Sequence, residues 1–141
     1  MSLKYKKLVV WQRADDLFIE VHRLTHQLFP SFERFELGSQ LRRAAYSVPA
    51  NVVEGSARST GRDKIRFFNI ASASLSELTY GTHAAFRLGY IDQTTYDRLE
   101  EQTRMVAAPL NGLIRRERLG LLGKAIASTR TLISLIGAMF A

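Results

Sequence analysis

The chain has 141 residues and no cysteine, and its 20 lysines and arginines against 13 aspartates and glutamates give a net charge of +7 at pH 7. The lack of cysteine excludes a disulfide scaffold and thiolate catalysis, and it fits a reducing compartment. A hydrophobic content of 46% with only 3 prolines argues against a disordered chain. This length predicts one domain that buries a substantial core.

The positive charge favours a polyanionic partner, with nucleic acid first and an anionic membrane surface second. The N-terminus is basic, but it lacks the apolar run that a signal peptide needs. We therefore expect a cytoplasmic protein.

A first helix is expected from about Val10 to Phe29, where Pro30 stops it. Its apolar residues recur at steps of three and four, which is typical of a helix that buries one face. The stripe consists of Val10, Ala14, Leu17, Val21, Leu24 and Leu28, widened by Phe18 and Thr25.

Gly38 or Ser39 is expected to cap a second helix that ends near Gly55. The connection before this helix carries three apolar side chains that should pack over the end of the bundle. They are Phe32, Phe35 and Leu37.

The second helix also carries a polar face at helical spacing, and Pro49 interrupts its backbone hydrogen bonding. One interpretation is a kinked core helix with a solvated back. The other is a polar network, extended by the third helix, that fixes the second helix against the third or against a neighbouring subunit. The expected members are Gln40, Arg43, Ser47, Asn51, Glu54 and Glu77.

Thr60 and Asp63 match an Asp variant of the capping box, which predicts a third helix that continues to about Leu88. The small residues from Ala71 to Ser74 should let a neighbouring helix approach closely. The expected core face is Phe68, Ala71, Leu75, Leu78 and Ala85.

Gly89 ends the third helix, and a fourth follows in which Pro109 is expected to cause a bend. Four amphipathic helices with short connections predict an all-α fold, an antiparallel up-down-up-down four-helix bundle over residues 1–118. The apolar positions of the fourth helix are Tyr96, Leu99, Thr103, Val106, Leu110 and Leu113.

Residues 119–141 form an apolar tail that is expected to be helical, either as a fifth segment or as an extension of the fourth helix. Its uncharged stretch from Thr131 covers only 11 residues. A membrane span needs about 20, so no membrane anchor is expected. We expect the tail, which includes Leu122, Ile126, Ile133, Ile136 and Phe140, to pack against the bundle or another subunit.

The sequence predicts no enzyme, no cofactor and no metal site. His22 and His26 have a spacing that can share a metal, but no third ligand accompanies them, so they are expected to be surface histidines. A nucleophile elbow is missing, and the glycines near residue 60 lack the lysine of a phosphate loop.

Basic residues cluster before the first helix, at the start of the third and at the end of the fourth, which meet at one end of an antiparallel bundle. Helix N-termini attract anions, and arginine and lysine pair with phosphates. Stacking aromatics are few, which favours phosphate contact over base recognition. A merely solvated charged end is the alternative. The expected phosphate-binding residues are Arg58, Arg62, Lys64 and Arg66, supported by Lys6, Lys7, Arg115 and Arg116.

Several short motifs occur between residues 10 and 91. The second-helix block is the most specific, since a proline and an asparagine inside a helix after two arginines and two alanines are unusual. The motifs are Val10-Trp11-Gln12-Arg13-Ala14, Phe29-Pro30, Ser39-Gln40-Leu41-Arg42-Arg43-Ala44-Ala45, Ser47-Val48-Pro49-Ala50-Asn51, Glu54-Gly55, Phe67-Phe68-Asn69-Ile70-Ala71 with Ser74 and Glu77, and Leu88-Gly89-Tyr90-Ile91.

Over roughly residues 8 to 116, the chain resembles the bacterial four-helix-bundle family called 23S rRNA intervening-sequence proteins, whose members are encoded within insertions in large-subunit rRNA genes. The resemblance implies a ring-like homopentamer without established enzymatic activity. Similar basic pentameric bundles bind nucleic acid as accessory proteins of retroelement reverse transcriptases, which is an analogy at the level of fold.

We therefore expect a non-catalytic, basic homo-oligomer that binds RNA or DNA through phosphate contacts. The alternative is an oligomeric protein–protein adaptor or structural bundle, in which the positive charge serves solubility or steers association.

Overall fold

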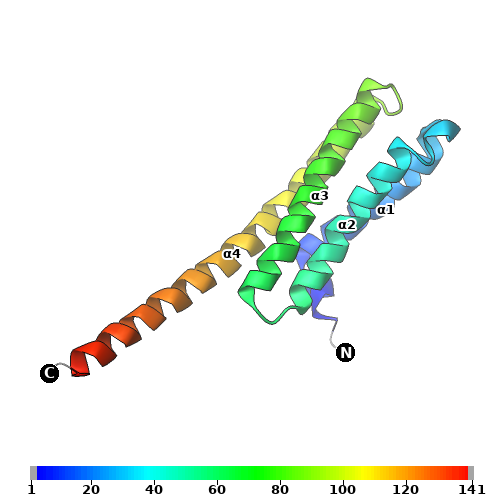
Figure 1. Cartoon of the computed structure of the whole chain (residues 1–141). Helices are drawn as coiled ribbons and strands as arrows, with labels where there is room; N and C mark the ends of the chain where they lie inside the picture. The colour runs from blue at the N-terminus through cyan, green and yellow to red at the C-terminus, as the bar shows by residue number, and fades with distance from the viewer. Residues whose placement is uncertain (1–2, 140–141) are drawn as a thin grey trace.

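The computed structural model describes residues 3–139, which form four long α-helices and, within that range, no strand. The helices alternate in direction (Figure 1), and each packs against its neighbours in a closed order, with α4 returning to α1. The predicted all-α four-helix bundle is confirmed. The helices are α1 (Val9–Leu28), α2 (Leu37–Ala57), α3 (Gly61–Arg87) and α4 (Gln93–Met139), with short 3-10 turns η1 (Lys4–Lys7) and η2 (Ser31–Glu33) before α1 and α2.

The predicted apolar faces of the four helices meet in one core. One position in α1 differs from the prediction. Leu28 is 50% exposed, and Phe29 lies in the core instead, with its ring centroid 5.3 Å from that of Tyr90. The side chains with the least exposed surface include Leu17, Val52, Leu78, Leu99 and Val106.

The connection between α1 and α2 does not cover the end of the bundle as predicted. Phe32 is 70% exposed and Phe35 is 86% exposed, while Leu37 alone packs partly against the core. Both phenylalanines lie in the short connection before α2, outside the four long helices. The spacing of apolar residues predicts side-chain direction only within a regular helix, so it does not apply to them.

The N-terminus of α2 is capped by Glu33 rather than by Gly38 or Ser39. The Leu37 N–H donates to the Glu33 carboxylate at 2.9 Å, and the Tyr90 hydroxyl donates to the same carboxylate at 2.8 Å. This second hydrogen bond raises the pKa of the Tyr90 hydroxyl. One carboxylate therefore starts α2 and ties it to the connection before α4.

The helices α2 and α3 share the most extensive packing in the molecule. A Cβ added to Gly55 would lie 2.5 Å from the Phe68 ring, and one added to Gly81 would lie 2.6 Å from Leu41. A larger residue at either position would therefore force the facing side chain to move.

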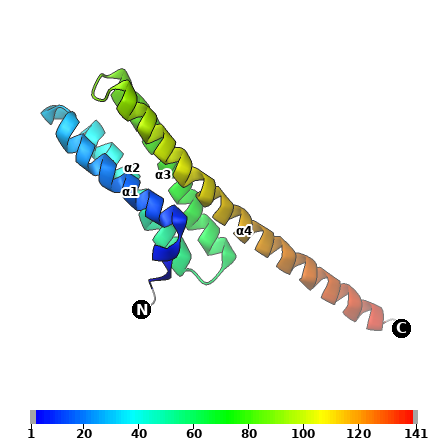
Figure 2. The same cartoon turned by 180° about the vertical axis from the view of Figure 1, so that it is seen from behind.

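The helix α4 continues through Pro109, where we predicted a bend, without interruption (Figures 1 and 2). A proline at this position leaves the Met105 carbonyl without its usual helical donor. Arg13 of α1 supplies a replacement, since its Nη1 donates to that carbonyl at 2.9 Å. The helix therefore keeps its hydrogen bonding through a contact with α1.

Beyond the bundle, α4 projects as a free helix (Figure 2). The tail is an extension of the fourth helix, which was one of the two predicted arrangements. Of its described residues, only Leu121 near its start lies close to the bundle, beside Gly61, and every residue from 122 to 139 is exposed. Phe140 lies outside the described residues. By length and composition alone, α4 is the one helix among residues 3–139 that could cross a membrane, since an 18-residue window has a mean hydropathy of 1.3.

Replacing Gly55 with alanine is expected to lower the free energy of unfolding by about 1–3 kcal/mol, because the new methyl group must displace Phe68. Urea denaturation monitored by circular dichroism measures the change. The matched control is Gly112→Ala in α4, where no atom lies within 4 Å of the added Cβ. This control should stabilise the helix by roughly 0.5–1 kcal/mol. Equal effects of the two substitutions would contradict the proposed close approach.

The contact between Arg13 and Met105 can be measured with a double-mutant cycle. Arg13→Met should cost about 1 kcal/mol of stability, the usual net value of one hydrogen bond. In a Pro109→Ala background the cost should shrink, because residue 109 then donates its own N–H to the Met105 carbonyl. A cost of Arg13→Met that is the same in both backgrounds would exclude this role.

Candidate phosphate-binding site

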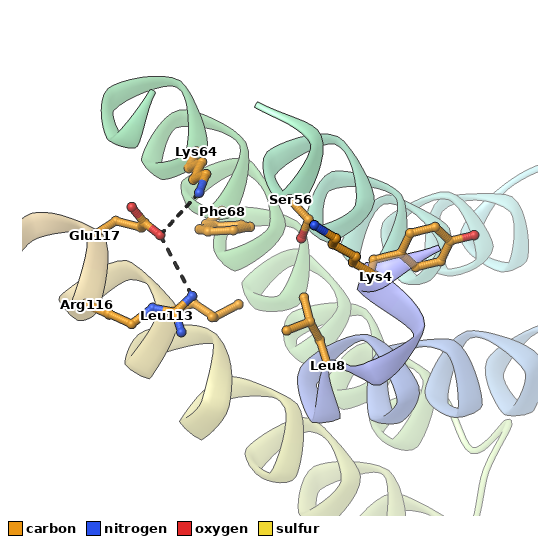
Figure 3. A pocket seen from close by; sticks show the side chains of 9 residues that line it. Lys4, Leu8, Ser56, Lys64, Phe68, Leu113, Arg116 and Glu117 are labelled. Carbon is orange, nitrogen blue, oxygen red and sulfur yellow. Dashed lines mark ion pairs between the residues drawn. The ribbon is translucent and has the colours of Figure 1, made fainter. Parts of the chain in front are cut away.

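A cavity of about 160 Å³ opens at the end of the bundle where α1 and α3 begin and α4 passes by (Figure 3). We call it the basic-end cavity. Three cationic side chains from different elements reach it: Lys4 from η1, Lys64 from α3 and Arg116 from α4. Its lining residues are Lys4, Tyr5, Leu8, Ser56, Lys64, Phe68, Leu113, Arg116 and Glu117.

The first turn of α3 places Lys64 at this cavity. The Asp63 N–H donates to the Thr60 hydroxyl at 3.2 Å, and that hydroxyl donates to the Asp63 carboxylate at 3.0 Å, so the predicted cap is confirmed. Capping fixes the direction of the helix axis and leaves the positive end of the helix dipole near the cavity.

One acidic residue, Glu117, lies between the cations. Its carboxylate is 3.7 Å from the Lys64 ammonium and 3.9 Å from the Arg116 guanidinium, as the dashed lines of Figure 3 show. Only 18% of the Glu117 side chain is exposed. The cavity therefore holds an internal carboxylate that competes with any bound anion. Glu117 was not among the predicted residues, although it stands alone among the arginines at the end of the bundle.

Two of the predicted arginines lie elsewhere, on the ring of Phe67. The Arg58 guanidinium is 4.6 Å from the ring centroid and that of Arg66 is 4.9 Å away. Arg58 also pairs with Glu54 at 2.6 Å. Contacts of this kind are worth about 0.5–1 kcal/mol at exposed sites. Phe67, which was not predicted to have a role, thus orders two cations next to the start of α3.

The remaining predicted cations surround the site without lining it. Lys6, Lys7 and Arg115 are exposed, and so is Arg62 in the first turn of α3. The η1 turn that carries Lys6 is held to α1, because Gln12 donates to the Lys6 carbonyl at 2.8 Å. The three basic clusters do share one end of the bundle, but of the eight predicted residues only Lys64 and Arg116 reach the cavity.

The polar network contains fewer residues than predicted. The Asn51 amide donates to the Ser47 carbonyl at 2.8 Å and the Ser47 hydroxyl at 3.0 Å, and Ser74 of α3 donates to the Ser47 hydroxyl at 2.8 Å. Ser74, rather than Glu77, therefore connects the network to α3. The other members, Gln40, Arg43, Glu54 and Glu77, are exposed and, within residues 3–139, form no hydrogen bond to this trio.

The described residues offer little for metal chemistry. His22 and His26 are exposed, with ring centroids 4.9 Å apart. Desolvation, followed by the nearby Arg42 guanidinium, lowers the pKa of His26. Between residues 3 and 139, no three histidine or carboxylate side chains are placed to hold a metal ion.

The model of the 23S rRNA-intervening sequence protein family matches residues 6–112. The chain belongs to this family. The match includes the end of η1, all of α1, α2 and α3, and α4 as far as Gly112, so Lys4, Arg116 and Glu117 lie outside it.

The fold is similar to a solved structure of a protein of unknown function from the S23 ribosomal protein family of Bacteroides thetaiotaomicron VPI-5482. The TM-score is 0.70 at 23% sequence identity, over 75% of this chain and 98% of the other. At that identity the similarity establishes the fold alone. No curated protein matches the chain.

Replacing Glu117 with glutamine is expected to strengthen binding of a short RNA about two- to fivefold, because surface charge pairs contribute up to about 1 kcal/mol. Fluorescence anisotropy at low salt measures the dissociation constant. Glu101→Gln is the control, since Glu101 also pairs with an arginine on α4 but does not line the cavity. A control that strengthens binding equally would show that only net charge matters.

Proposed function

We propose that this family member is a non-catalytic, cytoplasmic protein that binds RNA or DNA through phosphate contacts at the basic end of its bundle. One observation carries the proposal: Lys4, Lys64 and Arg116, separated widely in sequence, surround a single cavity. Glu117 balances only one of these charges, because it pairs with both Lys64 and Arg116, so the lining of the cavity keeps a positive excess. Convergence of this kind is what an anionic ligand requires.

The electrostatics of α3 support an anion at this place. The N-terminus of a helix carries unpaired N–H groups and the positive end of the dipole. Arg62 lies exposed in that first turn, and Arg58 and Arg66 are held nearby on Phe67. A nucleic-acid backbone that passes the cavity therefore meets further cations on the same end of the molecule. A free phosphate would use only the cavity.

The geometry favours contact with the backbone over recognition of bases. Single-stranded binding proteins present aromatic faces on which bases stack. Here the Phe67 ring is approached by two guanidinium groups, and Phe68 is 3% exposed. We therefore propose low sequence preference and a strong dependence of affinity on salt.

We propose that the protein acts as a homo-oligomer. A pentamer is the state that the family resemblance implies. Several copies would offer several basic ends to one polyanion, which raises the overall affinity without any new contact. Light scattering gives the number of copies, and a monomer at working concentration would count against this part of the proposal.

A protein-binding adaptor is the second candidate, favoured by the two exposed aromatic residues of the connection before α2, Phe32 and Phe35. Exposed apolar patches often mark protein interaction sites. Binding at such a patch should survive high salt, whereas phosphate binding should not.

The double variant Lys64→Gln with Arg116→Gln is expected to weaken RNA and duplex DNA binding. On duplex DNA, the slope of log affinity against log salt should fall by about 0.9 for each lost phosphate contact. The control, Arg23→Gln with Arg87→Gln, removes the same charge from the opposite end of the bundle. It should leave the slope unchanged. No binding by the wild-type protein at low salt would refute the proposed function.

A further inference from the structure

We propose that the projecting half of α4, from Leu119 to Met139, is an association surface whose occupant is the same helix of a second copy of this chain. We call this segment the free tail. It begins after the bundle ends, every residue from 122 to 139 is exposed, and it lies beyond the family match, which ends at residue 112. The proposal rests on the homo-oligomer of the proposed function, for which it identifies an interface, and it does not depend on phosphate binding.

The side of α4 that faces solvent changes character where the bundle ends. Beside the bundle this side is polar, and beyond residue 118 the same side becomes apolar. All of these residues follow one another at steps of three, four or seven, so they share one helix face. The face carries Arg104, Asn111, Arg115 and Arg118, and then Leu122, Ile126, Thr129, Ile133 and Ile136.

The apolar residues of the free tail have the spacing of a coiled coil. Alternate steps of three and four place six residues on the seam, and both charges of the segment, Lys124 and Arg130, fall outside it. Ile126 and Ile133 widen the seam on one side, which suits association of two or more helices. The seam residues are Leu122, Ala125, Thr129, Leu132, Ile136 and Met139.

The apolar face is accessible to a second helix because it is turned away from the bundle. Ile114 and Glu117 face the bundle, and Leu121 continues that line close to Gly61. At about 100° per residue, the centre of the apolar face lies roughly a third of a turn from this line. A second α4 can therefore lie along the free tail without meeting the first bundle.

The size of the face fits an interface between proteins. Five large apolar side chains on it are between 48% and 65% exposed, and Leu132 and Met139, on the adjoining seam, are 57% and 82% exposed. Full burial removes about 60–120 Å² for each such side chain, or roughly 400–800 Å² in all. A standard interface buries about 800 Å² on each partner. The seven are Leu119, Leu122, Ile126, Leu132, Ile133, Ile136 and Met139.

The charges of the free tail argue against a lipid bilayer as the occupant. Arg130 lies in the middle of the segment, and a charged side chain at the centre of a bilayer is energetically costly. Helices that lie in the membrane interface usually carry a polar face rich in lysine and arginine. Here that face is mostly glycine, alanine, serine and threonine, with only Lys124 and Arg130 charged.

The test is sedimentation equilibrium of the full chain over a wide range of concentration, with circular dichroism to confirm equal helix content. Ile133→Glu with Ile136→Glu places two carboxylates on the apolar face. Association should weaken by more than about tenfold, since buried carboxylates must be desolvated. The control, Ala127→Glu with Thr131→Glu, adds the same charge to the opposite face and should change association less than about twofold, as expected of exposed positions.

A chain that ends at Arg118 separates this interface from any assembly through the bundle. The dissociation constant of this truncated chain should be at least about tenfold higher than that of the full chain, because the packed interface is lost. Unchanged association after this truncation, equal effects of the two double variants, or a wild-type monomer at all concentrations would each overturn the proposal. A vesicle-flotation experiment tests lipid as the occupant. If the wild-type chain is a monomer that floats with phosphatidylglycerol vesicles and the Ile133→Glu, Ile136→Glu variant does not float, the occupant is lipid and the proposal is overturned. RNA binding through Lys64 and Arg116 can persist or fail independently of all these outcomes.

Discussion

The close approach of α2 to α3 is the constraint on which the rest of the molecule depends. Gly55 and Gly81 admit Phe68 and Leu41 at the two ends of the interface, and the Ser47 and Ser74 hydroxyls join between them. Because the two helices lie so close, the turn between them can be short, and α3 starts at the same end of the bundle as η1. Phe68, held against Gly55, forms a wall of the basic-end cavity. The packing of the core and the position of Lys64 are thus consequences of the same missing side chains.

A second constraint is the continuity of α4 through Pro109. Pro109 removes a helical hydrogen bond, and Arg13 restores it from a position 92 residues earlier in the chain. Because α4 stays continuous there, the residues that follow keep a fixed register relative to the bundle. That register directs Arg116 and Glu117 to the cavity and turns Ile133 and Ile136 to solvent. A break at Pro109 would have uncoupled both surfaces from the bundle.

The helices, their order and most of the core follow from hydrophobic periodicity, because a repeat of three and four residues identifies a buried face directly. Periodicity does not decide between neighbours at a helix end, and so Leu28 was assigned to the core in place of Phe29. The cap supplied by Glu33 and the contact of Arg13 with α4 join distant parts of the chain, which no local pattern reveals. In the site, counting charges locates the basic end but does not show that Glu117 lies among the cations. Only the register of α4 against α3 places it there.

The free tail begins at the same end of the bundle as the cavity, and this position links the two proposed surfaces. Arg116 and Glu117 line the cavity, and the apolar face starts only one or two turns later on a different side of α4. Association through the free tail would therefore bring the basic ends of neighbouring copies near one another. Binding sites held together in this way act at a high effective concentration toward a long polyanion. The apolar face, which contributes nothing to phosphate binding itself, would then decide how many phosphate sites one nucleic acid meets.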